Sequence, residues 1–249
     1  MRQQRIALFG GTFDPVHVGH LTVARELLKL FALDIVLFIP AHVAPHKRDA
    51  PPTSAWHRFA MLGLATQEDA RLFVSPVELE APERPYTVET LARLRAEFGQ
   101  SARLFFVMGA DSWMEIDTWR EWERVLTLTD HVVITRPGHV LGTEHVTEAV
   151  RARIVDLRGA GDEVIARSVE DHEAGIFFTD TVQMDVSATE IRRALGGGED
   201  ERLNATTLLP PPVANFIEKY ELYREAHETD RTNAAGGHHA RHAEDAGAN

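Results

Sequence analysis

The chain has 249 residues and a formal net charge of −12, from 38 acidic against 26 basic side chains. An acidic surface disfavours nucleic-acid binding, so positive groups that handle an anionic substrate must be gathered locally. The absence of cysteine excludes a disulfide framework, a cysteine nucleophile and a thiolate metal site. No apolar run is long enough for a signal peptide or a membrane span, so we expect a soluble, cytoplasmic protein with no membrane partner.

Apolar runs typical of buried strands alternate along the chain with helical patterns. Strands are predicted at residues 5–9, 34–40, 72–77, 104–108 and 131–135. Helices are predicted at 18–30, after Ser54, at 87–98 and at 119–126. Nearly all-apolar strands separated by helices predict an α/β fold with a Rossmann-like, doubly wound parallel sheet.

The second half of the chain is patterned less clearly. Residues 140–173 are charged and are interpreted as a helix plus a loop, with no role assigned. Helices at 185–195 and 211–223 predict a small C-terminal helical part over about 185–223. We expect one domain over residues 1–223 and a disordered tail over 224–249, whose histidines have no assigned role.

Polar, glycine-rich or basic segments follow three of the predicted strands, at residues 10–20, 41–48 and 109–113. In an open parallel sheet, ligands bind beyond the carboxyl ends of the strands. The three segments therefore predict one ligand site at that edge.

The first of these segments, GGTFDPVHVGH at residues 10–20, leads from a strand into a helix. Glycines allow a phosphate to approach the backbone, and the N–H groups of a helix start bind anions. His17 and His20 are three residues apart and share one side of a helix. Taken singly, these features also fit an ordinary turn, surface histidines or a metal pair. The segment is neither GxxxxGK[ST] nor GxGxxG.

The second segment, VSATEIRR at residues 186–193, begins another helix. Ser187 and Glu190 fit a capping box, and a well-capped helix would explain them. Thr189 and Arg192 add a hydroxyl and a guanidinium beside the same N–H groups. Together these groups could also bind a polyphosphate.

The first segment resembles the signature of the HxGH nucleotidyltransferase superfamily, and its full form is most similar to nicotinate-mononucleotide adenylyltransferases. The second segment resembles that superfamily's ISxTxxR motif, with Val186 in place of Ile. The resemblance implies that residues 1–223 form a nucleotidyltransferase domain. It also implies ATP contacts for a larger set of residues: His17 and His20 on the phosphates, Ser187, Thr189 and Arg192 on the β- and γ-phosphates, Gly10, Gly11, Thr12 and Phe13 around the nucleotide, and Gly19 making room for adenosine.

Shorter motifs resemble the mononucleotide site of the same enzymes. The resemblance implies that Lys47, in the segment PHK, neutralises the departing pyrophosphate. It implies mononucleotide contacts for Tyr86, Thr87, Asp111, Trp119 and Arg136. Without the resemblance, Lys47 fits a solvated loop and Thr87 fits a helix cap. Trp119 then fits a core side chain, and Arg136 fits a turn. A helix start favours a negative charge, so the pyridine carboxylate of nicotinate would be favoured at the helix start after Tyr86. This is a reason to prefer nicotinate over nicotinamide, and the strength of the preference stays open.

The expected function is therefore transfer of the adenylyl group of ATP to nicotinate mononucleotide, giving deamido-NAD and pyrophosphate in NAD biosynthesis. The catalytic residues would be His17, His20, Lys47 and Arg192. Mg²⁺ would accompany ATP, bridging phosphates without a dedicated set of protein ligands. The partners would be these two small molecules, and a homo-oligomer stays open.

Two alternatives remain at this stage. One is another adenylyl- or cytidylyltransferase of the superfamily, such as a phosphopantetheine adenylyltransferase. The other is a nucleotide sensor without catalytic activity.

Overall fold

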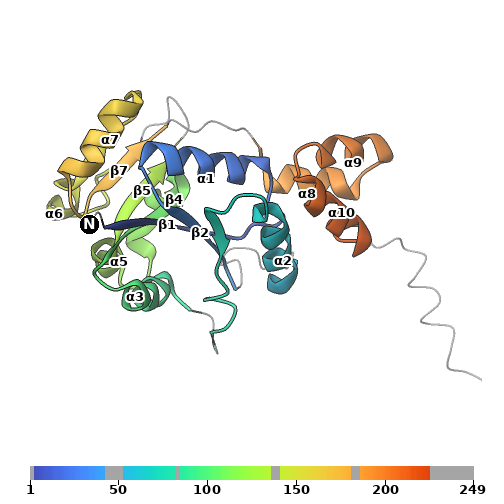
Figure 1. The fold of residues 1–249 in the computed structure, drawn as a ribbon, viewed down its shortest axis with the longest axis horizontal. Coiled ribbons are helices and arrows are strands. Elements are labelled where there is room, and N and C mark those ends of the chain that lie inside the picture. Colours follow the sequence, from blue (N-terminus) through green and yellow to red (C-terminus); the bar gives the residue numbers. More distant parts are fainter. Residues whose placement is uncertain are drawn as a thin grey trace, which may run out of the picture.

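A computed structural model describes residues 3–42, 53–81, 83, 85–135, 141–180 and 186–224. Its centre is a seven-stranded parallel sheet in the order β3-β2-β1-β4-β5-β7-β6 (Figure 1). The strands are β1 Gln4–Gly11, β2 Ile35–Pro40, β3 Leu72–Val74, β4 Ala102–Gly109, β5 Asp130–Ile134, β6 Ile154–Asp156 and β7 Ile176–Thr179. The predicted α/β, Rossmann-like parallel sheet is confirmed.

Helices connect the strands and follow the last of them. They are α1 Val18–Leu30, α2 Ala55–Thr66, α3 Thr87–Phe98, α4 Ala110–Met114, α5 Trp122–Leu128, α6 Glu148–Arg151, α7 Asp162–Asp171, α8 Ala188–Gly196, α9 Glu199–Thr206 and α10 Pro211–Lys219. None of these described helices is long and apolar enough to cross a membrane.

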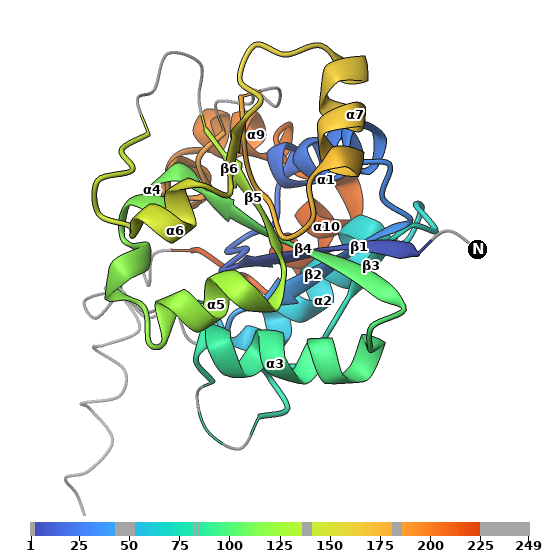
Figure 2. The ribbon, with the colours of Figure 1, turned by 90° about the vertical axis from the view of Figure 1, so that its left-hand side faces the viewer.

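Apolar side chains on both faces of the sheet explain why helices cover it on two sides. Along β1, Ala7 joins one hydrophobic cluster with α1, α2 and α7, whereas Ile6 and Leu8 join another with α3, α4, α5 and α6. Figures 1 and 2 show α1 and α7 on the side of the sheet opposite α3 and α5. Each strand is consequently buried on both faces, as its continuous apolar sequence predicted.

The C-terminal helices belong to the same core as the sheet. Ile191 and Leu195 of α8 and Val213 and Ile217 of α10 are buried in the cluster that contains α1 and α2. The backbone N–H of Val18, at the start of α1, donates to Leu208 O at 3.0 Å. The C-terminal helical part is thus fixed against the start of α1.

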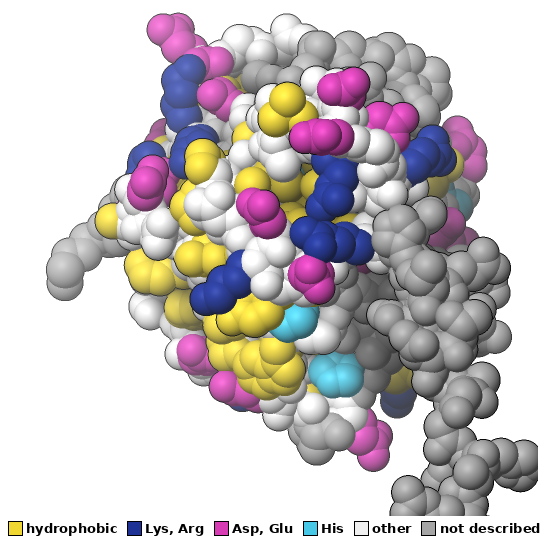
Figure 3. Space-filling view, turned by 90° about the vertical axis from the view of Figure 1, so that its right-hand side faces the viewer, with side chains coloured by type: hydrophobic (Ala, Val, Ile, Leu, Met, Phe, Trp, Pro, Cys, Tyr) yellow, Lys and Arg dark blue, Asp and Glu magenta, His cyan; other side chains and the backbone are white. Residues whose placement is uncertain are grey.

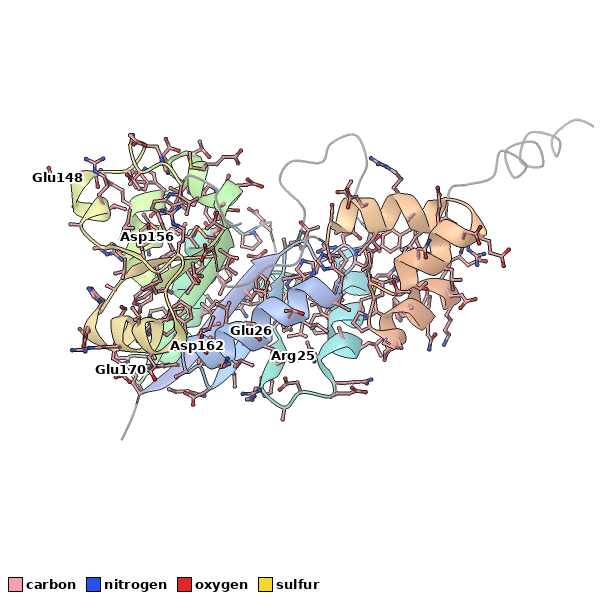
Figure 4. The ribbon with its side chains drawn as sticks, turned by 90° about the horizontal axis from the view of Figure 1, so that it is seen from above. Arg25, Glu26, Glu148, Asp156, Asp162 and Glu170 are labelled. Atoms are coloured by element: carbon pink, nitrogen blue, oxygen red, sulfur yellow. The ribbon has the colours of Figure 1, made fainter. Side chains whose placement is uncertain are left out.

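Helix α7 lies along α1, with Asp162 at its start near the end of α1 (Figure 4). Lys29 and Asp162 form an ion pair at 2.9 Å, and Arg5 approaches Glu170 at 3.9 Å. Ion pairs with exposed members contribute little to stability. The buried side chains Ile165 and Val169 therefore hold this helix in place.

Several predicted boundaries were wrong. Residues 140–173 contain α6, β6 and α7 instead of one helix and a loop, and neither β7 nor α9 was predicted. The helix predicted at 119–126 begins only at Trp122, because Glu121 takes a left-handed conformation with φ of 51°. The strand at 72–77 ends at Val74, and α10 ends at Lys219. The tail predicted at 224–249 lies outside the described residues after Arg224.

His131 is an unusual core residue. Its side chain is fully buried in β5, and neither ring nitrogen has a hydrogen-bond partner of ordinary geometry within the described part of the chain. Burial, and then the charge of Arg153, lower its pKa from 6.5 to about 3. The folded protein therefore keeps this ring neutral at a pH where the unfolded chain binds a proton.

His131→Leu is expected to make the free energy of unfolding less dependent on pH. In the native protein, the contribution of the neutral His131 ring to stability is present above pH 6.5 and is lost as the pH falls toward 3. Between pH 7.5 and pH 5 this loss amounts to about 2 kcal/mol. Urea unfolding at both pH values measures it, with the exposed His172→Ala as control. Equal pH dependence in His131→Leu and the native chain would contradict the assignment.

Candidate functional site

The candidate site lies where β1 and β4 end side by side at the carboxyl edge of the sheet. β1 pairs with β2 on one side and with β4 on the other, so the connections leave this point in opposite directions. Such a reversal in strand order leaves room for a ligand beyond the strands. The segment of residues 10–20 and the start of α1 occupy this position.

Phe13 anchors the loop between β1 and α1. Its backbone is left-handed, with φ of 49°, and its ring is buried against Phe9 and Phe38. A Cβ atom on Gly11 would lie 2.9 Å from this ring, so Gly11 provides the space that the ring needs. The loop is thereby held with its backbone at the sheet edge, and nucleotide contacts of these residues stay a prediction.

His17 and His20 stack at the start of α1. Their ring centroids are 3.7 Å apart with an interplanar angle of 28°. The backbone N–H of His17 donates to Nδ1 of His20 at 3.2 Å. A neutral His20 must then carry its proton on Nε2, which becomes a hydrogen-bond donor.

Burial keeps both imidazoles neutral in the ligand-free protein. It lowers the pKa of His17 from 6.5 to about 4. Burial and the proximity of His17 also lower the pKa of His20 well below its usual value. Nδ1 of His17 is buried without a hydrogen-bond partner among the described residues. The pair therefore offers directed hydrogen-bonding groups to a ligand at neutral pH.

Arg192 joins the second segment to the first. Its Nη1 donates to the carbonyl oxygen of Asp14 at 2.6 Å, and its Nη2 donates to Oγ1 of Thr189 at 3.2 Å. A contact across 178 sequence positions thus brings the start of α8 to the loop before α1. Ser187 is the N-cap of α8, but its side chain makes no cap hydrogen bond, so the predicted capping box with Glu190 is wrong. The Ser187 hydroxyl therefore does not cap α8, and its contact with ATP stays a prediction.

Gly19 lies where the two segments touch. A Cβ atom there would be 3.0 Å from Nδ1 of His17 and 3.5 Å from Cβ of Val186. The His17 ring and Val186 thus leave no room for a Cβ atom at Gly19, and the predicted packing of adenosine at this glycine stays a prediction.

Gly19→Ala is expected to displace the His17 ring by a few tenths of an ångström and to lower turnover on the order of tenfold. Gly63→Ala in α2 is the matched control, because nothing lies within 4 Å of its Cβ position. That control should gain about 0.5–1 kcal/mol of stability without loss of activity. Unchanged turnover in Gly19→Ala would refute the close packing.

The described residues predicted for the mononucleotide lie before and at the start of α3, in α4 and shortly before α5. Tyr86, 51% exposed, precedes α3, and the guanidinium carbon of Arg120 lies 4.6 Å from its ring centroid. Both line a cavity of about 350 Å³ together with Val77, Ala81, Glu83, Pro85, Glu89, Thr90 and Arg93. Thr87 is the first residue of α3, and Trp119 is partly buried in a T-shaped contact with Phe106. Asp111 is exposed in α4.

Two predicted site residues, Lys47 and Arg136, lie outside the described residues. The structure adds Arg58, which sequence reasoning missed. Its side chain is fully buried and donates to the carbonyl oxygens of Thr12 at 2.6 Å, Ala41 at 2.6 Å and Thr53 at 2.9 Å. The sequence held a signal, because Arg58 falls at helical spacing with the apolar residues Met61, Leu62 and Ala65.

The described side chains suit a metal ion that binds through the phosphates of the substrate and not one that the protein holds alone. Within the described ranges, no group of three or more His, Asp or Glu side chains could hold a metal ion. Mg²⁺ commonly keeps several waters and binds through substrate phosphates, which fits a site without its own ligand cage.

Fold and site together define a Rossmann-like α/β protein in which two helix starts meet at the sheet edge, an arrangement suited to anionic ligands. The profile of the cytidylyltransferase-like family matches residues 8–194. Relatives from Pseudomonas aeruginosa and Desulfatibacillum aliphaticivorans are 38% and 35% identical over 90% and 88% of this chain and 99% of their own lengths. Both are described as probable nicotinate-nucleotide adenylyltransferases. The chain therefore belongs to the nicotinate-nucleotide adenylyltransferases of the cytidylyltransferase-like family.

The fold is also similar to a solved structure. The nicotinic acid mononucleotide adenylyltransferase of Plasmodium falciparum, complexed with NaAD, has a TM-score of 0.63 at 18% identity. The match covers 88% of this chain and 97% of that chain. At this identity the likeness concerns the fold alone.

Proposed function

We propose that this protein transfers the adenylyl group of ATP to nicotinate mononucleotide and releases pyrophosphate, forming deamido-NAD for NAD synthesis. The membership of its family supports this reaction. The observation that carries it is the contact between Arg192 and Asp14, which joins two segments suited to phosphate groups.

The reaction needs positioning more than proton transfer. The phosphate of the mononucleotide is already an anion at neutral pH, so its oxygen attacks the α-phosphorus directly. A new P–O bond forms as the bond between the α-phosphorus and the bridging oxygen breaks, and pyrophosphate leaves with that electron pair. Catalysis then depends on stabilising charge on the phosphoryl oxygens.

The proposed roles follow from where each group lies. Nε2–H of His20 would donate to an α-phosphate oxygen, and His17 would line the same position. Arg192 would hold the β- and γ-phosphates together with Ser187, Thr189 and the N–H groups of α8. Lys47 would act on the departing pyrophosphate, and Mg²⁺ would enter with ATP, where it neutralises phosphate charge.

Formation of deamido-NAD tests the proposal directly. The purified full-length chain is incubated with Mg²⁺, ATP and nicotinate mononucleotide, and both products are quantified. Stoichiometric dinucleotide and pyrophosphate are expected. ATP binding without products would favour a nucleotide sensor, and turnover only with phosphopantetheine or CTP would favour another nucleotidyltransferase.

Arg120 and the start of α3 suggest how nicotinate is preferred over nicotinamide. The Arg120 side chain is exposed, and a pyridine carboxylate in the cavity beside Tyr86 would gain a positive partner there. Arg120→Gln is expected to lower kcat/KM for nicotinate mononucleotide about tenfold and to leave that for nicotinamide mononucleotide nearly unchanged. Arg124→Gln is the control, because Arg124 is also exposed and also pairs with Glu121 but does not line the cavity. An equal loss of kcat/KM with both substrates would show that Arg120 does not bind the pyridine carboxylate.

A further inference from the structure

Asp14 is the centre of a buried set of contacts at the proposed nucleotide loop. Its side chain and backbone are only 3% exposed. Its carbonyl oxygen accepts from Arg192 at 2.6 Å, and Oδ2 accepts from the backbone N–H of Thr53 at 3.3 Å. Oδ1 accepts from the hydroxyl of Tyr223 at 2.7 Å. One residue of the loop therefore contacts α8, the start of α2 and the segment after α10.

Tyr223 reaches this position from the far end of the described chain. It lies beyond α10, with a left-handed backbone at φ of 65°, and its bond to Asp14 spans 209 sequence positions. Burial and the charge of Asp14 raise the pKa of its hydroxyl. The hydroxyl is therefore protonated and donates to the carboxylate of Asp14.

The loop has two further supports that do not depend on Tyr223. Arg58 donates to the carbonyl oxygen of Thr12, two residues before Asp14. Arg192 donates to the backbone of Asp14 and not to its side chain. In the described part of the chain, the carboxylate of Asp14 thus takes one hydrogen bond from the side chain of Tyr223 and one from the backbone of Thr53.

We propose that the hydroxyl of Tyr223 is a positioning group for nucleotide binding, which acts through the carboxylate of Asp14. It fixes the carboxylate, and the carboxylate fixes the backbone that carries the acceptor for Arg192 and leads to His17. Tyr223 contacts none of the reacting atoms in this arrangement. The inference rests on the proposed function, because it concerns binding of ATP by the same site.

Tyr220, three residues before Tyr223, provides a matched control. It is 49% exposed at the end of α10. Figure 3 shows hydrophobic side chains gathered on the side of the molecule where the C-terminal helices lie. The Tyr220 ring packs against Phe216 and His57. Tyr220→Phe keeps these ring contacts, as Tyr223→Phe keeps the ring of Tyr223, so the two variants compare one hydroxyl with another.

The experiment measures KM for ATP and for nicotinate mononucleotide separately, with kcat, in Tyr223→Phe, Tyr220→Phe and the native chain. Calorimetric titration with the ATP analogue α,β-methylene-ATP measures binding without turnover. Tyr223→Phe should raise KM for ATP and the dissociation constant of the analogue about three- to tenfold, while KM for the mononucleotide stays within twofold. A merely structural loss would lower the active fraction and leave both KM values unchanged.

A second variant guards against indirect effects. Asp14→Asn should weaken analogue binding, and adding Tyr223→Phe to it should cost less than Tyr223→Phe costs alone, because the two groups act as one unit. Unchanged analogue binding in Tyr223→Phe, or full additivity of the two substitutions, would overturn the inference. A native chain that makes no deamido-NAD but binds the analogue would defeat the proposed function and still allow this test.

Discussion

Replacing His20 with alanine is expected to lower kcat/KM for adenylyl transfer by about 10²- to 10³-fold in a protein that still folds. The physical reason is the loss of a fixed donor, because the backbone of His17 occupies Nδ1 and orients Nε2–H. The α-phosphate would lose a partner that is set before the reaction and needs no rearrangement. Steady-state kinetics with ATP and nicotinate mononucleotide measure the change.

His20→Gln separates the donor from the ring. A glutamine amide can place an N–H near the position of Nε2, so this variant should retain more activity than His20→Ala. The exposed His172, which lies beyond α7, serves as the control, and His172→Ala should behave as the native chain. Near-native activity in a folded His20→Ala protein would show that His20 has no catalytic role.

Arg58→Met is expected to lower the free energy of unfolding by about 3–5 kcal/mol. The fully buried guanidinium donates to carbonyl oxygens from three segments, at Thr12, Ala41 and Thr53. Methionine fills much of the volume but leaves these acceptors without a donor in the protein interior. Urea unfolding of both proteins measures the difference.

The same substitution should also weaken ATP binding, since Thr12 and Ala41 lie on the two loops at the sheet edge. Arg25→Met is the control, because Arg25 is half exposed and reaches Asp69 only at 3.6 Å. A loss of stability in Arg58→Met no larger than in Arg25→Met would contradict the role assigned to the buried arginine.

Much of the fold was predictable because its strongest elements carry local signals. The helices at 18–30 and 87–98 have the predicted bounds, since each carries an apolar stripe along one face. The helix after Ser54 begins as predicted, with Oγ of Ser54 accepting from the N–H of His57. In contrast, β6 and β7 have only three and four residues. Strands this short form because they pair with neighbouring strands, and the local pattern of apolar residues carries no information about that pairing.

The sequence by itself determined the strand and helix alternation, the order of the motifs and the family. These properties depend on residues close together in the chain, such as the spacing of His17 and His20. Only the tertiary structure decided how the loop before α1 is held. Arg58, Arg192 and Tyr223 reach it across 46, 178 and 209 positions. Such contacts arise from the packing of α2, α8 and the end of α10 around one sheet edge, and no local pattern encodes which distant partner a buried polar group will find.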